Sequence, residues 1–314
     1  MAASKSQRKI HLRLTVHSIF YAPYLATVQG GFLRKEGLSA TLGVIPKGAD
    51  GFQLLRTGEI HVFQNAPSRS FTGLAKGEKD LPLQVAGINN RDGFYIVGRK
   101  PTKHFQWKDL EGMTLIPSAF AAQPLASLRL CLSEQGVNVG KIKLLEGLSS
   151  MEEAEEAFRR GRGDYVHLQN PNAQRLVEDG VGYIVASVGK ALGPIAFSSL
   201  AMSRDFLSQQ AKTAEAFLRA YAAAQKWISA SDAQTIAEAL APLFPGTSKA
   251  TLVKSVEGYK VLRTWLSSPL IPRASYERAL DMWIHAGHIH QRFPYEEVVD
   301  VRLAKKVLKN GEEA

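Results

Sequence analysis

An internal repeat constrains the possible fold more than any other feature of this sequence. Residues 52–65, FQLLRTGEIHVFQN, can be aligned with residues 155–168, EEAFRRGRGDYVHL, so that Gly58 meets Gly161. Each segment is typical of a helix closed by a glycine, followed by a short strand and a polar loop. Similar units also arise by chance, because the α/β repertoire is small. A true duplication predicts two similar α/β units that face each other across a cleft.

The polar loops of the two copies are the expected walls of that cleft. They read Gln64-Asn65-Ala66-Pro67 in the first copy and Gln169-Asn170-Pro171 in the second. Ligands of open α/β sheets bind beyond the carboxyl ends of the strands, where both loops would lie. We therefore expect Gln64 and Gln169 to share one groove.

Strand-like and helix-like segments alternate along the first two thirds of the chain, which favours parallel α/β layers. The helix expected over 149–161 carries Glu155/Arg159 and Glu156/Arg160 at i,i+4 spacing, which supports it locally. From Ala211 to Leu308 the sequence is mostly helical. The expected strands are 10–16, 38–45, 60–64, 83–89, 113–117, 142–147, 164–169 and 182–188.

Composition excludes several classes of protein. The chain of 314 residues is 45% hydrophobic, and its apolar runs fall far below the ~20 residues that span a bilayer. The single cysteine, Cys131, excludes an internal disulfide and a multi-cysteine metal site. Histidines 285, 288 and 290 lack an acidic or cysteine partner, so we expect neither a metal site nor a cofactor.

The net charge of +10 does not by itself identify a partner. Aromatic residues do not alternate with Lys and Arg as in single-strand binders, and no known nucleic-acid motif is present. We expect a solvated surface charge, with no nucleic-acid partner and no membrane insertion. The first nine residues, MAASKSQRK, are polar and are followed by no apolar leader segment, although a chain trimmed of its leader would look the same.

In the first unit, candidate ligand contacts lie at strand ends that precede a helix, where free N–H groups favour an anionic ligand group. For each, the alternative is an ordinary structural role as a helix cap, a turn or a packed aromatic side chain. Arg91 could hold an oxyanion with its guanidinium, or pair with its neighbour Asp92. The candidates are His17, Ser18, Phe20, Tyr21, Gln64, Asn65, Ser68 and Arg91.

The second unit repeats this arrangement after its own strands. His167 falls within an alternating strand, so a buried core histidine is the alternative there. Phe197 could stack on a planar ligand. The candidates are Ser118, Phe120, Gln123, His167, Gln169, Asn170, Phe197 and Ser198. No sequence motif points to catalytic residues.

A set of motifs, in order along residues 10–300, resembles the solute-binding proteins for nitrate, sulfonates, taurine and thiamine-pyrimidine precursors. His61 stands where that family usually has Asp. The motifs are Pro23, the turn 31–38 (GFLRKEGL), the segment 55–61 (LRTGEIH), the entry 109–112 (DLEG), the segment 157–164 (AFRRGRGD) and the helix 217–228 (FLRAYAAAQKWI).

The resemblance implies a type II periplasmic-binding-protein fold: two α/β lobes joined by two crossing strands, with a helical C-terminal region. The crossings would lie near 94–99 and 197–202. Residues 10–96 with 201–314 would form the first lobe, 97–200 the second, and 1–9 a flexible N-terminus.

The implied function is capture of a small anionic organic ligand, such as a sulfonate, an aromatic carboxylate or a thiamine pyrimidine, for an ABC-type permease and ATPase. A monomer is expected. The compartment would be the periplasm or cell surface if a leader was trimmed, and the cytoplasm if the chain is complete as written.

The alternative is a cytoplasmic enzyme on the same scaffold, similar to a desulfinase, a decarboxylase or a fungal pyrimidine synthase. Desulfinases use a cysteine in the loop after the first strand, where this chain has His17, Ser18 and Ile19. The fungal synthase carries a cysteine-rich motif, and this chain has one cysteine.

Overall fold

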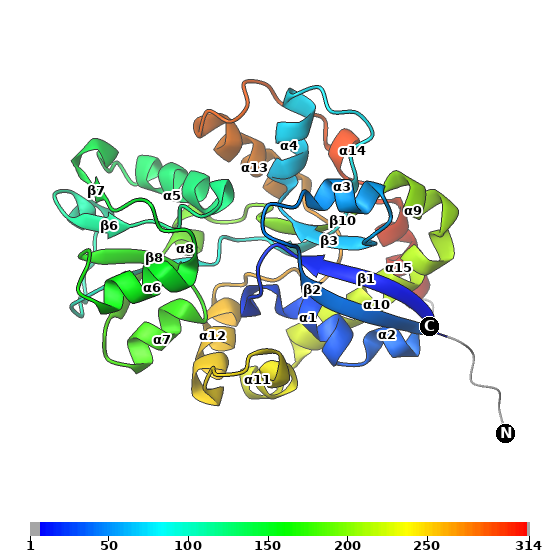
Figure 1. Ribbon diagram of the computed structural model, residues 1–314, viewed down its shortest axis with the longest axis horizontal. Helices are drawn as coiled ribbons and strands as arrows, with labels where there is room; N and C mark the ends of the chain where they lie inside the picture. The colour runs from blue at the N-terminus through cyan, green and yellow to red at the C-terminus, as the bar shows by residue number, and fades with distance from the viewer. Residues whose placement is uncertain (1–6, 313–314) are drawn as a thin grey trace.

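The computed structural model describes residues 7–312, which form two α/β lobes side by side (Figure 1). The first sheet has the strand order β2 (Leu38–Val44), β1 (Arg8–Leu14), β3 (Val62–Asn65), β10 (Ser198–Met202) and β4 (Leu83–Asn89). The second has the order β7 (Lys143–Leu144), β6 (Thr114–Ile116), β8 (Tyr165–Gln169), β5 (Phe94–Gly98) and β9 (Tyr183–Ser187).

The expected flexible N-terminus is only partly tested, since residues 1–6 lie outside the described part of the chain. Arg8 and Lys9 are not flexible: they begin β1 and pair with Leu38 and Ser39 of β2. The prediction was wrong at these two positions, because the strand extends into the basic segment before its first buried residue, Ile10.

The internal repeat occupies equivalent places in the two sheets. Helix α3 (Gly51–Arg56) leads into β3, and α6 (Met151–Arg159) leads into β8, each of which is the third strand of its sheet. Gly58 and Gly161 close the two helices with φ values of 75° and 84°, a backbone region that glycine enters without strain. The ends of β3 and β8 therefore correspond.

Each sheet contains one antiparallel strand that arrives from the other lobe. Strand β10 runs antiparallel to β3 and β4, and β5 runs antiparallel to β8 and β9. The chain passes between the sheets at residues 90–93 and again between α8 (Val188–Leu192) and β10.

These two passages correct the expected boundaries. Residues 94–96 were expected in the first lobe, but Phe94 pairs with Gln169 in the second sheet. Likewise Ser198 pairs with Asn89 in the first sheet, although 197–200 were expected in the second lobe. The crossing segments are thus the polar residues 90–93 before β5 and the largely apolar residues 193–197 before β10, and the two strands belong wholly to sheets. The pattern of apolar and polar residues along a buried strand does not show which of two sheets that strand joins.

The helices that surround the sheets have the following bounds. Near the first sheet are α1 (Ala22–Gln29), α2 (Phe32–Lys35), α3 and α4 (Pro67–Ala75), and near the second are α5 (Ala122–Glu134), α6, α7 (Asn172–Glu178) and α8. The C-terminal helices are α9 (Arg204–Gln209), α10 (Ala211–Ala230), α11 (Ala233–Leu240), α12 (Lys249–Val261), α13 (Arg273–His285), α14 (Tyr295–Val298) and α15 (Arg302–Glu312). Short 3-10 turns are Ile19–Tyr21, Trp107–Leu110, Val139–Lys141 and Ala241–Leu243.

The C-terminal region is helical, as the alanine-rich sequence predicted, and it touches both lobes. Helix α10 packs on α1 and α2, whereas α13 contacts both α4 and α5, and α12 contacts α7 (Figure 1). Apolar side chains of both sheets and these helices form one buried cluster, with a smaller one beside α3. Among residues 7–312, no helix combines the length and hydropathy needed to cross a membrane.

Candidate functional site

A cavity of about 380 Å³ lies between the two lobes. This volume is in the range of small-molecule sites. Its wall is built from strand ends and helix starts, as the topology of an open α/β sheet requires. The lining residues are Thr15, Val16, Tyr21, Gln64, Ala66, Phe94, Phe120, Ala121, Gln123, Pro124, Ser149, Ser150, Met151, Glu152, Gln169, Phe197 and Ser198.

Gln64 and Gln169, at the ends of β3 and β8, both line this cavity, and each is only 2% exposed. The Oε1 atom of Gln64 accepts hydrogen bonds from the Thr15 amide at 3.1 Å and from its hydroxyl at 2.8 Å. The Oε1 atom of Gln169 accepts from the Ser18 hydroxyl at 2.8 Å. Among the described residues, neither Nε2 group makes a hydrogen bond of good geometry, although Gln64 lies close enough to the Tyr21 phenol to lower the pKa of that group. Both amides can therefore still donate to a ligand.

Helix starts add backbone donors to the same wall. Ala66 precedes α4 and Ala121 precedes α5; both line the cavity, and neither helix has a side-chain cap. Pro67 begins α4 and Pro124 lies in the first turn of α5, and neither residue has an N–H group. The other N–H groups of these first turns carry a partial positive charge and can donate to a ligand. Helix α6 differs, because the Ser150 hydroxyl accepts from the Glu153 amide.

Aromatic side chains supply much of the remaining surface. Phe94, Phe120 and Phe197 line the cavity, and the rings of Phe94 and Phe197 lie 6.3 Å apart. Burial raises the pKa of Tyr21 to about 12, an effect that hydrogen bonding to Thr15 and Gln64 partly offsets. The Tyr21 phenol therefore stays protonated at neutral pH and can donate.

Contacts across the mouth of the cavity join the lobes. The Ser68 hydroxyl on α4 donates to Oε1 of Gln123 on α5 at 2.7 Å, and Nε2 of Gln123 donates to the Phe197 carbonyl at 3.4 Å. At the opposite end of α5, Glu134 contacts Arg278 on α13 at 2.5 Å. Gln123 thus lines the cavity and bridges the lobes at once.

Of the candidates named from the sequence, those that the structure brings to the cavity wall are Tyr21, Gln64, Phe120, Gln123, Gln169, Phe197 and Ser198. The others do not line it: His17, Ser18, Phe20, Asn65, Ser68, Arg91, Ser118, His167 and Asn170. Each of the second group has a structural partner instead.

In the first lobe, most of the residues that miss the wall support those that form it. Ser18 caps the 3-10 turn by accepting from the Phe20 amide, and it positions Gln169. The ring of His17 packs on Phe244 at 4.6 Å. Asn65 turns away from the cavity, where its Oδ1 atom accepts from Gln84 at 2.9 Å.

Arg91 and Asp92 fulfil neither expected role. The Arg91 guanidinium donates to the Gly189 carbonyl at 3.2 Å and does not line the cavity. Asp92 is fully buried; it accepts from the Phe94 amide at 2.5 Å and from the Ser127 hydroxyl, and it makes no ion pair with Arg91. Burial raises the pKa of Asp92 to about 7 against these hydrogen bonds. The order of charged residues in the sequence does not show whether a side chain such as that of Arg91 contacts its neighbour or a residue far away in the chain.

In the second lobe, the structure favours the core alternative for His167. Its ring lies 4.7 Å from Phe94, and its Nδ1 atom accepts from the Ser118 amide at 3.4 Å. Burial lowers the pKa of His167 to about 3, so the imidazole is neutral. The backbone of Asn170 donates to the Tyr259 hydroxyl at 3.0 Å, which ties the loop after β8 to α12.

The sequence reasoning missed one whole section of the wall, the start of α6 from Ser149 to Glu152. The sequence does contain a signal for this part of the wall, because Ser-Ser-Met-Glu-Glu is a helix-capping sequence. The other candidate residues were also selected at the starts of helices. Ala66 belongs to a loop that was expected to line the cleft. Nothing in the sequence gave a reason to select Thr15, Val16, Phe94, Ala121 and Pro124, most of which have apolar side chains.

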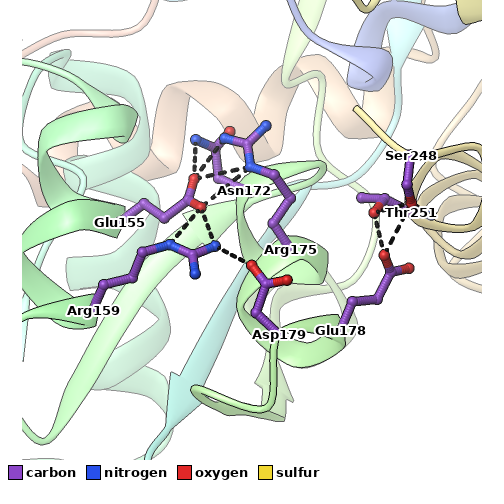
Figure 2. A network of polar contacts seen from close by, with 8 residues as sticks. All are labelled: Glu155, Arg159, Asn172, Arg175, Glu178, Asp179, Ser248 and Thr251. Carbon is purple, nitrogen blue, oxygen red and sulfur yellow. Dashed lines mark hydrogen bonds and ion pairs between the residues drawn. The ribbon is translucent and has the colours of Figure 1, made fainter. Parts of the chain in front are cut away.

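A polar network holds α6 in place (Figure 2). Glu155, only 6% exposed, contacts Arg159 at 2.8 Å and Arg175 at 2.5 Å, and it accepts from Asn172 at 2.9 Å. Arg159 also reaches Asp179 at 2.7 Å. Since Asn172 and Arg175 belong to α7, the network fixes the two helices together and thereby the helix start that lines the cavity.

Comparison with known proteins is consistent with this architecture. Residues 9–242 match the profile of the NMT1-like family. The chain belongs to this family. The NMT1-like chain is 27% identical over 311 residues to YtlA of Bacillus subtilis (strain 168), named a putative binding protein, covering 98% of this chain and 93% of YtlA.

Solved structures share the fold of the NMT1-like chain. The alkanesulfonate-binding protein SsuA of Xanthomonas axonopodis pv. citri superposes with a TM-score of 0.68 at 19% identity, covering 96% of this chain and 100% of SsuA. The desulfurization enzyme DszB superposes with a TM-score of 0.69 at 13% identity, covering 97% and 100%. The periplasmic-binding-protein fold of type II, expected from the sequence, is confirmed.

Proposed function

We propose that this NMT1-like protein is a solute-binding protein that captures a small organic molecule in the cavity between its lobes. The observation that carries the proposal is the pair of buried amides, Gln64 and Gln169, which face one cavity from opposite lobes with unpartnered Nε2 groups. Neither Nε2 atom is among the fully buried atoms without a partner, so both remain accessible from the cavity, and a ligand that accepts from both would add two hydrogen bonds.

The proposed ligand has an acceptor head group and an apolar or planar body. The amides and the uncapped starts of α4 and α5 offer neutral donors to an oxyanion such as a sulfonate or carboxylate. The rings of Phe94, Phe120 and Phe197 suit an aromatic ring, including a pyrimidine. Among residues 7–312, no Arg or Lys lines the wall, so the head group would be held by dipoles.

Binding would be coupled to closure of the lobes. A ligand that contacts both lobes favours the closed form by the difference between its affinities for the two forms. The contacts of Gln123 with Ser68 and Phe197 already bridge the lobes beside the ligand. They would add to the stability of that form.

Delivery to an ABC-type permease and ATPase is the proposed next step, in the periplasm or at the cell surface. It is supported by the family resemblance and by the similarity in fold to SsuA and to a ligand-binding component of an ABC-type import system from Staphylococcus aureus. We propose that the protein acts as a monomer, because one chain supplies both walls of the cavity.

A thermal-shift screen over sulfonates, aromatic acids and pyrimidines, followed by calorimetry of each hit, tests the proposal. A true ligand should raise the melting temperature and bind one-to-one. Gln169→Leu and the cavity-filling Ala121→Trp should each weaken binding by about tenfold or more. Gln53→Leu, on the exposed surface of α3, is the matched control. Binding that survives both cavity variants would contradict the assignment of the site.

Catalysis on the same scaffold is supported by no specific residue. Cys131 is buried in α5, and burial raises the pKa of its thiol, so the thiolate that a nucleophile requires is not available. Ser18, in the loop after β1, is committed to Gln169 and to the Phe20 amide. Recovery of the bound solute unchanged after long incubation would agree with binding, and its consumption would favour the enzyme.

A further inference from the structure

The charge of the cavity wall is opposite to that of the whole protein. The chain has 39 Lys and Arg against 29 Asp and Glu. Yet no Lys, Arg or His is among the described residues that line the cavity, and the only ionisable carboxylate there is Glu152. The excess of Lys and Arg over Asp and Glu therefore does not extend into the cavity. A positively charged group of a ligand would meet no basic side chain there.

Glu152 is also the one glutamate of α6 that has no partner among the described residues. The carboxylate of Glu153 accepts from the Ser149 amide at 2.7 Å. This hydrogen bond and, to a smaller extent, the charge of Lys47 lower the pKa of Glu153. Glu155 lies in the network with Arg159 and Arg175 (Figure 2), and Glu156 contacts Arg160 at 2.6 Å. Within residues 7–312, Glu152 is exposed on the cavity side and makes no hydrogen bond and no ion pair of this kind.

An acidic residue in the first turn of a helix is stabilised by the helix dipole, which alone would account for Glu152. Two further observations indicate a ligand. Three aromatic rings, Phe94, Phe120 and Phe197, line the same cavity, and aromatic faces attract cations. The unpartnered amides of Gln64 and Gln169 are donors and would hold an acceptor group of the same molecule.

We propose that Glu152 is a specificity-determining residue that pairs with an ammonium or other protonated nitrogen of the solute. The preferred solute class is then a zwitterion, whose acidic group is held by Gln64, Gln169 and the helix starts. This inference rests on the proposed function, because it assigns a role to Glu152 in the cavity where the solute is proposed to bind.

Matched pairs of probes that differ in the amine test the inference by calorimetry on the full chain. Suitable pairs are 4-(aminomethyl)benzoate with 4-methylbenzoate, and taurine with ethanesulfonate. The unaltered protein should bind the amine-bearing member of at least one pair about fivefold more tightly, the scale of a partly exposed ion pair. Glu152→Gln should abolish this preference and leave the amine-free member within twofold.

Glu156→Gln is the matched control, since Glu156 lies on the same helix but does not line the cavity. It should change neither affinity. Equal affinity for both members of every pair, or a preference that survives in Glu152→Gln, would overturn the role of Glu152. If only amine-free acids bind, the zwitterion inference fails and solute binding stands. If no probe and no member of the wider screen binds, both proposals fail.

Discussion

At the scale of single residues, the stability of the first crossing segment, residues 90–93, depends on the protonation of one buried carboxyl group. Asp92 lies in the first crossing segment, where it accepts from the Phe94 amide and the Ser127 hydroxyl. Removal of a carboxylate from water favours its protonated form. The crossing is therefore more stable when Asp92 carries a proton.

Stability should depend on pH through Asp92. Its pKa is about 7 in the folded protein and close to 3.8 when exposed, so the folded state holds a proton between these values and the unfolded state does not. The contribution of Asp92 to the free energy of unfolding is complete below about pH 4 and is lost as the pH rises through 7. Between pH 5 and pH 8 the loss should amount to about 3 kcal/mol.

Asp92→Asn should remove that loss, since an amide can accept from Phe94 and donate to Ser127 without titrating. The measurement is urea unfolding of both proteins at pH 5 and pH 8. His167 titrates with the opposite sign, because its pKa is lowered to about 3, so the variant is compared with the parent at each pH. An identical pH dependence in the two proteins would contradict a raised pKa for Asp92.

At the scale of elements, the start of α6 depends on the network behind it. Glu155 joins α6 to α7 through Asn172 and Arg175 (Figure 2). A buried carboxylate that loses its charge leaves its arginine partners uncompensated. Their side chains are 26% and 28% exposed, so water offsets part of the cost.

Glu155→Gln should lower the free energy of unfolding by about 1–2 kcal/mol, less than the value for a fully buried pair. It should also weaken solute binding, because Ser149–Glu152 would no longer be held at the cavity. Glu156→Gln removes an exposed pair on the same helix and should cost under about 0.5 kcal/mol. Denaturant unfolding measures the free energy of unfolding of both variants. An equal loss in Glu155→Gln and Glu156→Gln would show that the network does not anchor α6.

At the scale of the whole molecule, two contacts on different sides of the cleft hold the lobes together. Helix α13 reaches α5 through Arg278 and Glu134. On the other side, Glu178 at the end of α7 accepts from the hydroxyls of Ser248, at 3.1 Å, and Thr251, at the start of α12 (Figure 2). A carboxylate at a helix N-terminus is a favourable partner for the dipole of that helix.

Glu178→Ala should shift the protein toward an open form. We expect a larger radius of gyration without solute by small-angle scattering, and about fivefold weaker binding, because the closed form then lacks one of the contacts that bridge the lobes. Saturating solute should restore the radius of the parent protein. Glu238→Ala, which removes an exposed partner of Lys249, is the control for loss of a surface charge. An unchanged radius in the absence of solute would show that this contact does not influence closure.

The order of the elements and the position of the strand-end loops follow from local signals in the amino-acid sequence. Hydrophobic periodicity and helix-closing glycines are local signals, so the repeat around Gly58 and Gly161 already indicated that the polar loops with Gln64 and Gln169 follow corresponding strands. The same reasoning could name polar residues in those loops. It could not say which of them would face the cavity.

Tertiary structure decided that choice, because the direction of each side chain depends on partners far away in the sequence. Asn65 follows Gln64 directly, yet it turns to Gln84 while Gln64 lines the cavity. Arg91 contacts Gly189, and Ser18 supports Gln169. Neighbours in a strand point to opposite faces, and only the packing of both lobes fixes which face borders the cleft. For the same reason, the capping sequence before α6 became part of the wall only when the lobes were brought together.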